Sequence, residues 1–322
     1  MNTRIVPATR TLFKESFAVY WGLLKIMVPV MVLVEIGIRA GLVDFISDWA
    51  GPFMDLFGLP AEASLILATN LFVGLYPSVI ILLALAPDVA FTTADMTIIG
   101  GMLLFGHALP IEQVIVKRTG VSLIFSCFTR LFAMLVYGFI CHFLFSVFGL
   151  FDEPANILIA MDNADVDNSW MGWIISSLKS LFLIFWILTG LIALLKIMEY
   201  VGITRWLMKA LTPVLRILGI GPNAAPLAMV GILLGLSFGG GLIMREVDKG
   251  TLNPRSVFIS MIFLGFCHGL IEDTIIVMAI GGHWSAVFVG RILLSMLLII
   301  PLSFYVKRMS DKQFNLVYKT GK

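Results

Sequence analysis

Long apolar stretches alternate with short polar interruptions along nearly the whole chain. The stretches at 17–38 and 121–150 are each longer than the roughly 20 residues that a helix needs to cross a bilayer. Other apolar stretches are interrupted near their middle by histidine or by glycine and proline, the strongest breakers of regular structure. This pattern predicts an all-α polytopic membrane protein in which some segments cross the membrane and others break within it.

The composition excludes a soluble domain. Of the 322 residues, 59% are hydrophobic and 13% are charged, whereas soluble domains carry about 25% charged residues. The formal net charge of +2 gives no basic field that would hold nucleic acid. The stretch at 17–38 is too long for a signal-peptide core and lacks a small-residue cleavage site, so we expect a retained helix in contact with the lipid bilayer.

The sequence around His107 recurs around His268, at an offset of 161 residues (268 − 107), which is half the chain length. Phe-Gly-His-Ala-Leu around the first histidine corresponds to Phe-Cys-His-Gly-Leu around the second. Without any gap, the same offset pairs glycine with glycine, proline with proline and arginine with arginine at several other positions. We therefore predict a duplication, with a first repeat at 1–160 and a second at 161–322.

Each repeat contains five pieces: a long apolar helix, an amphipathic interfacial helix, a re-entrant hairpin, a broken helix and a second long apolar helix. In the first repeat we expect the interfacial helix at 42–56, the hairpin at 61–86 and the broken helix at 96–117. The corresponding pieces of the second repeat are expected at 203–218, 222–244 and 256–280. Broken backbone is tolerated at membrane depth only where protein or a water-filled cavity buries it, so these pieces indicate a shared central site.

Loop charges predict how the repeats lie in the membrane, because lysine and arginine collect on the cytoplasmic side. The charged residues of the first interfacial piece are all acidic, whereas its partner carries Arg205, Lys209 and Arg216. Equivalent pieces of opposite charge indicate that the two halves are inverted relative to each other. Three crossings and one hairpin per half satisfy the remaining loops with both termini cytoplasmic, and inverted repeats are common in secondary transporters.

Neutral polar groups and helix-breaking residues lie together in the two hairpins. The tips are predicted at the breaking residues, which are Gly74 and Pro77 in the first hairpin and Gly235, Gly239, Gly240 and Gly241 in the second. The hydrogen-bonding side chains are Asn70, Tyr76 and Ser78 in the first hairpin and Ser237 in the second. These side chains suit a polar solute, so we assign them to a substrate-binding site.

Ionisable and polar residues also occur at the two breaks in the fourth pieces. The first break carries His107, Glu112 and Gln113, and the second carries His268, Glu272, Asp273 and Thr274. A charged side chain at membrane depth costs about 2.5–3.5 kcal/mol, so these groups must face one another, a cavity or a neutralising proton. We predict that both sets line one substrate or ion site between the halves.

These residue types leave the coupling ion open. Histidine titrates near neutral pH, which makes coupling to H⁺ available. Oxygen atoms of broken backbone can equally hold Na⁺, and histidine with carboxylate can hold a transition metal. In a purely structural alternative, the histidines cap broken helix ends and the acidic residues suit the positive ends of half-helices. The sequence has no P-loop, so we expect neither a nucleotide-driven pump nor a cofactor.

Arg130 and Arg291 recur at equivalent positions in the last apolar helix of each half. A buried arginine at such a position can clamp an anionic group of a solute or neutralise the acidic cluster. A structural ion pair is an equally good interpretation.

These motifs resemble the Gate, or nucleoside-recognition, family of bacterial membrane proteins. The resemblance rests on Gly-Ile-Gly-Pro-Asn at 219–223, which opens the second hairpin, and on Phe-Cys-His-Gly-Leu-Ile-Glu-Asp-Thr at 266–274, which breaks the next helix. Relatives in that group include spore maturation proteins A and B and the membrane part of ferrous-iron transporter B. The arrangement is more distantly similar to concentrative nucleoside transporters.

The resemblance implies a solute bound between the hairpins and the helix breaks, and an elevator-like movement of this core. It implies a multi-pass protein of the bacterial cytoplasmic membrane, and by analogy the small scaffold of six crossings favours a homodimer. The expected function is an ion- or proton-coupled secondary transporter of a small polar solute, with a nucleoside or related compound as a candidate.

Two other classes of function stay open. A non-transporting membrane assembly or signalling factor is compatible with the resemblance to spore maturation proteins. An intramembrane serine hydrolase is a minor alternative, because residues 235–239 match the pattern GxSxG and His268 could serve as the base. That pattern requires a strand-to-helix turn, and the surrounding residues are apolar, so we do not expect an enzyme.

Overall fold

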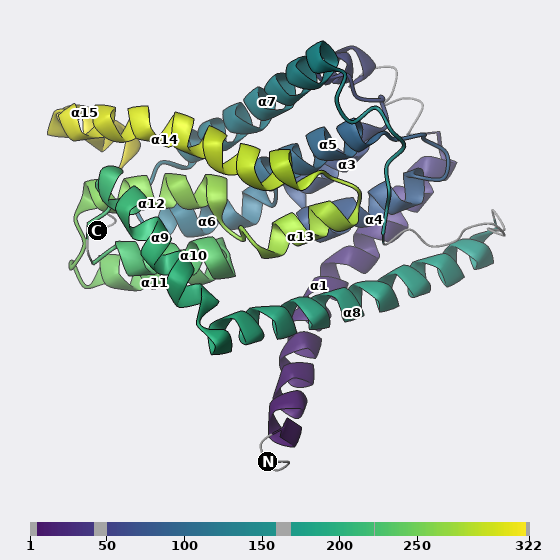
Figure 1. Ribbon diagram of the computed structural model, residues 1–322, viewed down its shortest axis with the longest axis horizontal. Helices are drawn as coiled ribbons and strands as arrows, with labels where there is room; N and C mark the ends of the chain where they lie inside the picture. The colour runs from purple at the N-terminus through teal and green to yellow at the C-terminus, as the bar shows by residue number, and fades with distance from the viewer. Residues whose placement is uncertain (1–4, 42–49, 159–168, 222, 320–322) are drawn as a thin grey trace.

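The computed structural model describes residues 5–41, 50–158, 169–221 and 223–319 (Figure 1). The helices of the first half are α1 (Ile5–Arg39), α3 (Ala63–Phe72), α4 (Leu75–Leu85), α5 (Thr93–Gly106), α6 (Leu109–Arg118) and α7 (Leu123–Phe148). Those of the second half are α8 (Trp170–Val201), α9 (Ile203–Ile217), α10 (Ala225–Leu234), α11 (Leu236–Asp248), α12 (Pro254–Cys267), α13 (Glu272–Ala279), α14 (Arg291–Arg308) and α15 (Asp311–Val317). A 3₁₀ turn η1 (Asp55–Phe57) precedes α3, and a π-helical turn η2 (Ser285–Gly290) precedes α14. Within these described ranges, the β structure consists of two isolated bridges.

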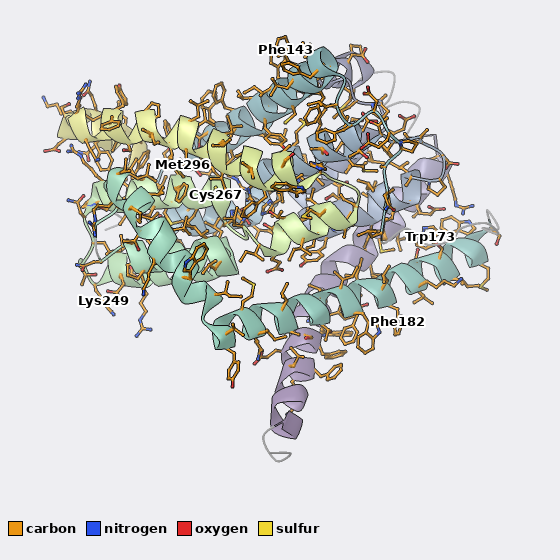
Figure 2. All side chains as sticks on the ribbon, in the orientation of Figure 1. Phe143, Trp173, Phe182, Lys249, Cys267 and Met296 are labelled. Atoms are coloured by element: carbon orange, nitrogen blue, oxygen red, sulfur yellow. The ribbon has the colours of Figure 1, made fainter. Side chains whose placement is uncertain are left out.

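Five helical stretches of the described chain are long and apolar enough to cross a membrane. They are Thr93–Arg118, Leu123–Phe148, Trp170–Met198, Pro254–Ala279 and Ser285–Arg308. Large apolar side chains project from these helices, as Phe143 of α7 and Phe182 of α8 do in Figure 2, where they are 56% and 64% exposed. Lipid accommodates such a surface and water does not. The chain is therefore an all-α polytopic membrane protein, as the sequence predicts.

The helices of the two halves recur at the offset of the sequence repeat. Helix α12 begins and ends 161 residues after α5 (254 − 93 and 267 − 106). The turn before α4 lies at Gly74 with φ 131° and ψ −177°, and the turn before α11 lies at Gly235 with φ 92° and ψ 165°. Glycine adopts this conformation without the steric cost that a Cβ would bring. The same glycine turn thus joins the two helices of each hairpin.

Helices α7 and α14 run in opposite directions. The start of α7 lies beside the C-terminal segment, where Val121 forms an isolated bridge with Tyr318. The segment after α7 contacts His283, whose ring lies 4.5 Å from that of Phe151. His283 precedes η2 and α14 whereas Tyr318 follows them, so the start of α7 meets the end of α14 (Figure 1). The last long helices of the two halves are therefore antiparallel.

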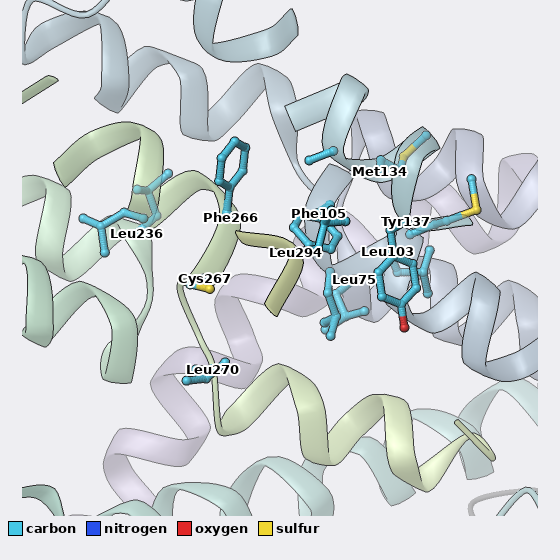
Figure 3. Packing of buried hydrophobic residues seen from close by; sticks show 14 of the residues in the cluster. Leu75, Leu103, Phe105, Met134, Tyr137, Leu236, Phe266, Cys267, Leu270 and Leu294 are labelled. Atoms are coloured by element: carbon cyan, nitrogen blue, oxygen red, sulfur yellow. The ribbon is translucent and has the colours of Figure 1, made fainter. Parts of the chain in front are cut away.

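Equivalent residues of the two halves meet in the core. The rings of Phe105 and Phe266 lie 6.2 Å apart at the ends of α5 and α12, and both are labelled in Figure 3. The rings of His107 and His268 lie 4.6 Å apart at the adjoining breaks. Because each pair consists of repeat equivalents that touch each other, we describe the halves as related by a local two-fold axis between the breaks.

The structure corrects the expected hairpin tips. Gly239, Gly240 and Gly241 lie inside α11, and Pro77 lies in the first turn of α4, so the tips are at Gly74 and Gly235. A glycine inside a helix costs about 1 kcal/mol relative to alanine, a cost that tertiary packing can override, and α11 packs on α10, α6 and α12. Proline is tolerated in a first turn because its missing N–H would lack a partner there.

The two interfacial pieces are described to different extents. Helix α9 (Ile203–Ile217) lies within the expected range 203–218 and has an exposed and a buried side, with Trp206 68% exposed and Leu215 fully buried. Of the first piece, 42–56, residues 42–49 lie outside the described part of the chain. The remainder forms a helical turn that continues into η1.

Candidate functional site

Four helix ends converge at the two breaks. Helix α5 ends before His107 and α12 ends before His268, and both histidines have extended backbone, with φ −74° and −73°. The next residue of each half, Ala108 or Gly269, has a left-handed backbone with φ of 48° and 56°. Alanine pays a steric cost of about 1–2 kcal/mol for this conformation, so the packing around the first break holds it there.

The two histidine rings face each other through their Nε2 atoms, which lie 2.6 Å apart. The Nδ1 atom of His107 lies 3.1 Å from the carbonyl oxygen of Leu103, and that of His268 lies 2.6 Å from the carbonyl oxygen of Leu264. A carbonyl oxygen only accepts hydrogen bonds, so each Nδ1 carries a hydrogen and donates it. In the neutral form of both rings, two Nε2 lone pairs therefore point at each other.

Glu112 joins the histidine pair from the first turn of α6. Its Oε1 atom lies 3.4 Å from Nε2 of His107 and 3.1 Å from Nε2 of His268. Its Oε2 atom accepts a hydrogen bond from Nη1 of Arg130 on α7. All four of these residues are less than 10% exposed. The ionisable residues from both breaks thus form one buried cluster, as the sequence predicts for His107, Glu112 and His268.

The arginines clamp the ends of the broken helices. Arg130 donates from Nε to the carbonyl of Phe105 and from Nη2 to that of His107, each at 2.9 Å. Arg291 repeats both bonds at 2.9 Å with the carbonyls of Phe266 and His268, and its Nη2 also lies 3.2 Å from the carbonyl oxygen of Leu104 in the other half. The carbonyls at the end of a helix lack intrahelical partners and carry partial negative charge, which a buried guanidinium satisfies.

The first hairpin is bonded to the first break. The Asn70 side chain donates to the carbonyl of Leu103 at 3.0 Å, and its backbone carbonyl accepts from the Ala108 N–H at 2.8 Å. The second hairpin makes a similar bond, from the Leu270 N–H to the carbonyl of Ile232 at 2.9 Å. The hydroxyl of Ser78 lies 2.6 Å from the Leu75 carbonyl oxygen in its own helix. Asn70 therefore fastens the hairpin to the break.

The first hairpin also reaches the second break. The hydroxyl of Tyr76 on α4 donates to Oε1 of Glu272 on α13 at 2.8 Å. The neighbouring Asp273 lies against Gly269, where a Cβ would collide with its carboxylate. Its Oδ2 atom is buried and has no hydrogen-bond partner among the described residues. The sequence predicts that Tyr76, Glu272 and Asp273 lie near one site, and the structure joins Tyr76 to Glu272 directly while Asp273 packs on Gly269 at the same break.

The remaining predicted residues differ in their surroundings. Gln113 is 1% exposed, and its amide has no hydrogen-bond partner in the part of the chain that is described. The hydroxyl of Thr274 donates to the Leu270 carbonyl at 2.7 Å, and the residue lines an apolar pocket of about 280 Å³ beside α13. The side chain of Ser237 lies outside the described residues. Its backbone lies at the start of α11, which follows the helix α10 rather than the strand that the GxSxG pattern requires.

Sequence reasoning missed the bonds between the arginines and the backbone carbonyls. Each arginine lies 23 residues after the histidine of its own half, and it bonds that histidine's carbonyl. This constant spacing of 23 residues is visible in the sequence, and it indicates that each arginine contacts the break of its own half. The identity of the partner was not visible, because carbonyl groups occur at every residue.

A known family model matches part of the second half of the chain. Residues 168–284 match the family model named Gate and described as nucleoside recognition. The chain is also 26% identical to the membrane protein YvoD of Bacillus subtilis over 270 residues, which cover 83% of this chain and 84% of the relative. No solved structure matches.

The match to the Gate model confirms the resemblance expected from the sequence. It spans α8 to α13 and includes His268, Glu272 and Asp273, whereas Arg291 lies beyond its end. The rest of the buried cluster, including His107, comes from the first half, which repeats the same helices. The buried cluster therefore combines residues inside the matched segment with residues of the other half.

Proposed function

We propose that the protein is an ion- or proton-coupled secondary transporter of a small polar solute in the bacterial cytoplasmic membrane. The observation that carries this proposal is the buried cluster at which two broken helices from oppositely directed halves meet. Ionisable groups are costly at membrane depth and mark substrate or ion pathways when they are retained there. Broken helices around a central site, contributed by two related halves, are the usual construction of secondary transporters.

The direction of the helices supports a site that opens to both sides of the membrane. Because α7 and α14 are antiparallel, each half offers the same broken helix from the opposite side. In our proposal the two halves are inverted in the bilayer, α1 supplies a sixth crossing beside the five apolar stretches, and both termini are cytoplasmic. Movement of the hairpins and broken helices against the long helices would expose the cluster alternately to the two sides of the membrane.

Two copies of this small scaffold would form a homodimer.

The available hydrogen-bonding groups favour a nucleoside or a related compound as the solute. The Gln113 amide is buried beside the first break and has unused bonding capacity within the described residues. Nucleosides carry several donors and acceptors on base and ribose, which such groups can recognise. The family description of the Gate domain agrees with this class.

The contact between Tyr76 and Glu272 is the proposed coupling element. It joins the first hairpin to a half-helix of the other half through a single hydrogen bond of 2.8 Å. Binding of H⁺ or Na⁺ at the Glu272 carboxylate would weaken this bond, because the carboxylate would then share its oxygen with the ion. Ion binding would in this way free the hairpin to move.

The experiment is uptake of radiolabelled uridine and adenosine into proteoliposomes under an imposed H⁺ or Na⁺ gradient. We expect accumulation with one of the gradients, at least tenfold slower in Glu272→Gln and reduced in Tyr76→Phe. Glu153→Gln is the matched control, since Glu153 is exposed in the linker and should keep the wild-type rate. Wild-type rates in Glu272→Gln would remove the coupling role of this residue. The absence of gradient-driven accumulation of either nucleoside would refute the proposed substrate class and favour a non-transporting assembly factor.

A further inference from the structure

The Nε2 atoms of His107 and His268 lie close together, and neither carries a hydrogen that it could donate to the other. Each ring donates its Nδ1 hydrogen to a backbone carbonyl four residues earlier, which fixes the neutral tautomer. At 2.6 Å, two bare imidazole lone pairs repel each other. A positive species between the two Nε2 atoms would turn this repulsion into attraction.

Two carboxylates lie near the histidine pair. Oε1 of Glu112 lies 3.4 and 3.1 Å from the two Nε2 atoms, while its other oxygen is held by Arg130. One ligand atom each from His107, His268 and Asp273 lie within 4.8 Å of one another. Asp273 Oδ2 is buried and without a hydrogen-bond partner among the described residues. Two imidazole nitrogens and the Asp273 carboxylate thus converge from both halves of the protein, and a Glu112 oxygen lies beside both nitrogens.

The supporting contacts are those of a metal centre. Histidines that bind metal almost always donate the other ring N–H to a carboxylate or a backbone carbonyl, and both histidines here do so. Carboxylate ligands are themselves hydrogen-bonded in such sites, and the bond from Arg130 supplies this for Glu112. These contacts orient the ligands before any ion binds.

We propose that His107, His268, Glu112 and Asp273 bind one divalent transition-metal cation of the zinc class on the local two-fold axis. Ligands at about 2.0–2.1 Å in a tetrahedron lie about 3.3 Å from one another. The distances from Glu112 to the two histidines already match this spacing, and the histidines need to separate by only about 0.7 Å from their 2.6 Å contact. The Asp273 carboxylate would offset part of the charge of the cation, and the Glu112 carboxylate would be shared between the cation and Arg130.

The ligand types exclude the cations that prefer oxygen. Imidazole nitrogen suits zinc, copper, iron and nickel, whereas magnesium and calcium take oxygen ligands. Four protein ligands would fill a tetrahedral site completely, which is typical of a metal that holds structure together. The cation would tie the two helix breaks, and therefore the two halves, to each other.

The test is equilibrium zinc binding to the full-length protein, purified in detergent and stripped of metal with a chelator. We expect one zinc per chain, measured by elemental analysis after competition with a chromophoric chelator. His107→Asn and His268→Asn should each bind at least tenfold more weakly, because asparagine can keep the amide donor to the carbonyl but has no Nε2. His142→Asn is the matched control, since His142 bonds Ser146 on the outer part of α7, and it should bind like the wild type.

Two further measurements guard against variants that misfold. Asp273→Asn keeps the side-chain shape and should also weaken binding, and X-ray absorption of the zinc-loaded wild type should show two imidazole ligands. Substoichiometric zinc in the wild type, undiminished binding in both histidine variants, or a spectrum without imidazole would each overturn the proposal. In that case a proton shared between the two Nε2 atoms would account for their short contact. Because binding is measured without any solute or gradient, its outcome is independent of the uptake experiment.

Discussion

Replacement of Arg291 by lysine tests whether the guanidinium clamp holds the second helix break together. Arg291 is fully buried and donates to three backbone carbonyls, those of Phe266, His268 and Leu104. A hydrogen bond to a charged group contributes about 1.5–3 kcal/mol. Lysine keeps the positive charge but is a compact point charge without the planar fork, so it can satisfy one of the three carbonyls. We therefore expect Arg291→Lys to lower the free energy of unfolding by about 3–6 kcal/mol.

The assay is equilibrium unfolding in mixed micelles with increasing denaturing detergent, followed by tryptophan fluorescence. Arg308→Lys is the control on the same helix, because Arg308 is exposed at the end of α14 and its replacement should change stability by no more than about 0.5 kcal/mol. If Arg291→Lys were as stable as this control, the three carbonyl bonds would contribute little, and the clamp would not explain why the arginine is buried.

Three further outcomes follow from the structure. Ala108→Gly should stabilise the protein by about 1 kcal/mol in the same unfolding assay, since it removes the Cβ from a left-handed backbone, and a loss of stability would contradict the strain argument. Asn70→Ala should cost about 0.5–1.5 kcal/mol because the Leu103 carbonyl loses one of its two side-chain donors and keeps the one from His107, whereas an unchanged midpoint would mean that the hairpin is held by other contacts. In the proposed topology, Asp88→Cys should react with an impermeant thiol reagent in intact cells and Asp248→Cys should not. The reverse pattern would refute the inverted orientation of the halves.

Several features could be predicted from the sequence because they depend on local composition. The apolar stretches are long enough to cross a bilayer whatever they pack against, so the membrane class follows from hydropathy alone. The positions of the breaks also follow locally, since α5 and α12 end at the two predicted histidines. The glycine run in the second hairpin misled this local reasoning, because Gly239 and its neighbours lie within α11, whose packing outweighs their weak helix propensity.

The sequence determined which residues of the two halves are equivalent, and only the tertiary structure decided which of them touch. A repeat offset is the same whether two equivalent residues lie on the symmetry axis or at opposite ends of the molecule. His107 and His268 meet because the breaks lie at the axis, while Arg130 and Arg291 reach backbone carbonyls that no pattern of residue types can reveal. The Tyr76–Glu272 bond likewise joins segments 196 residues apart, and it exists because the packed helices bring the first hairpin to the second break.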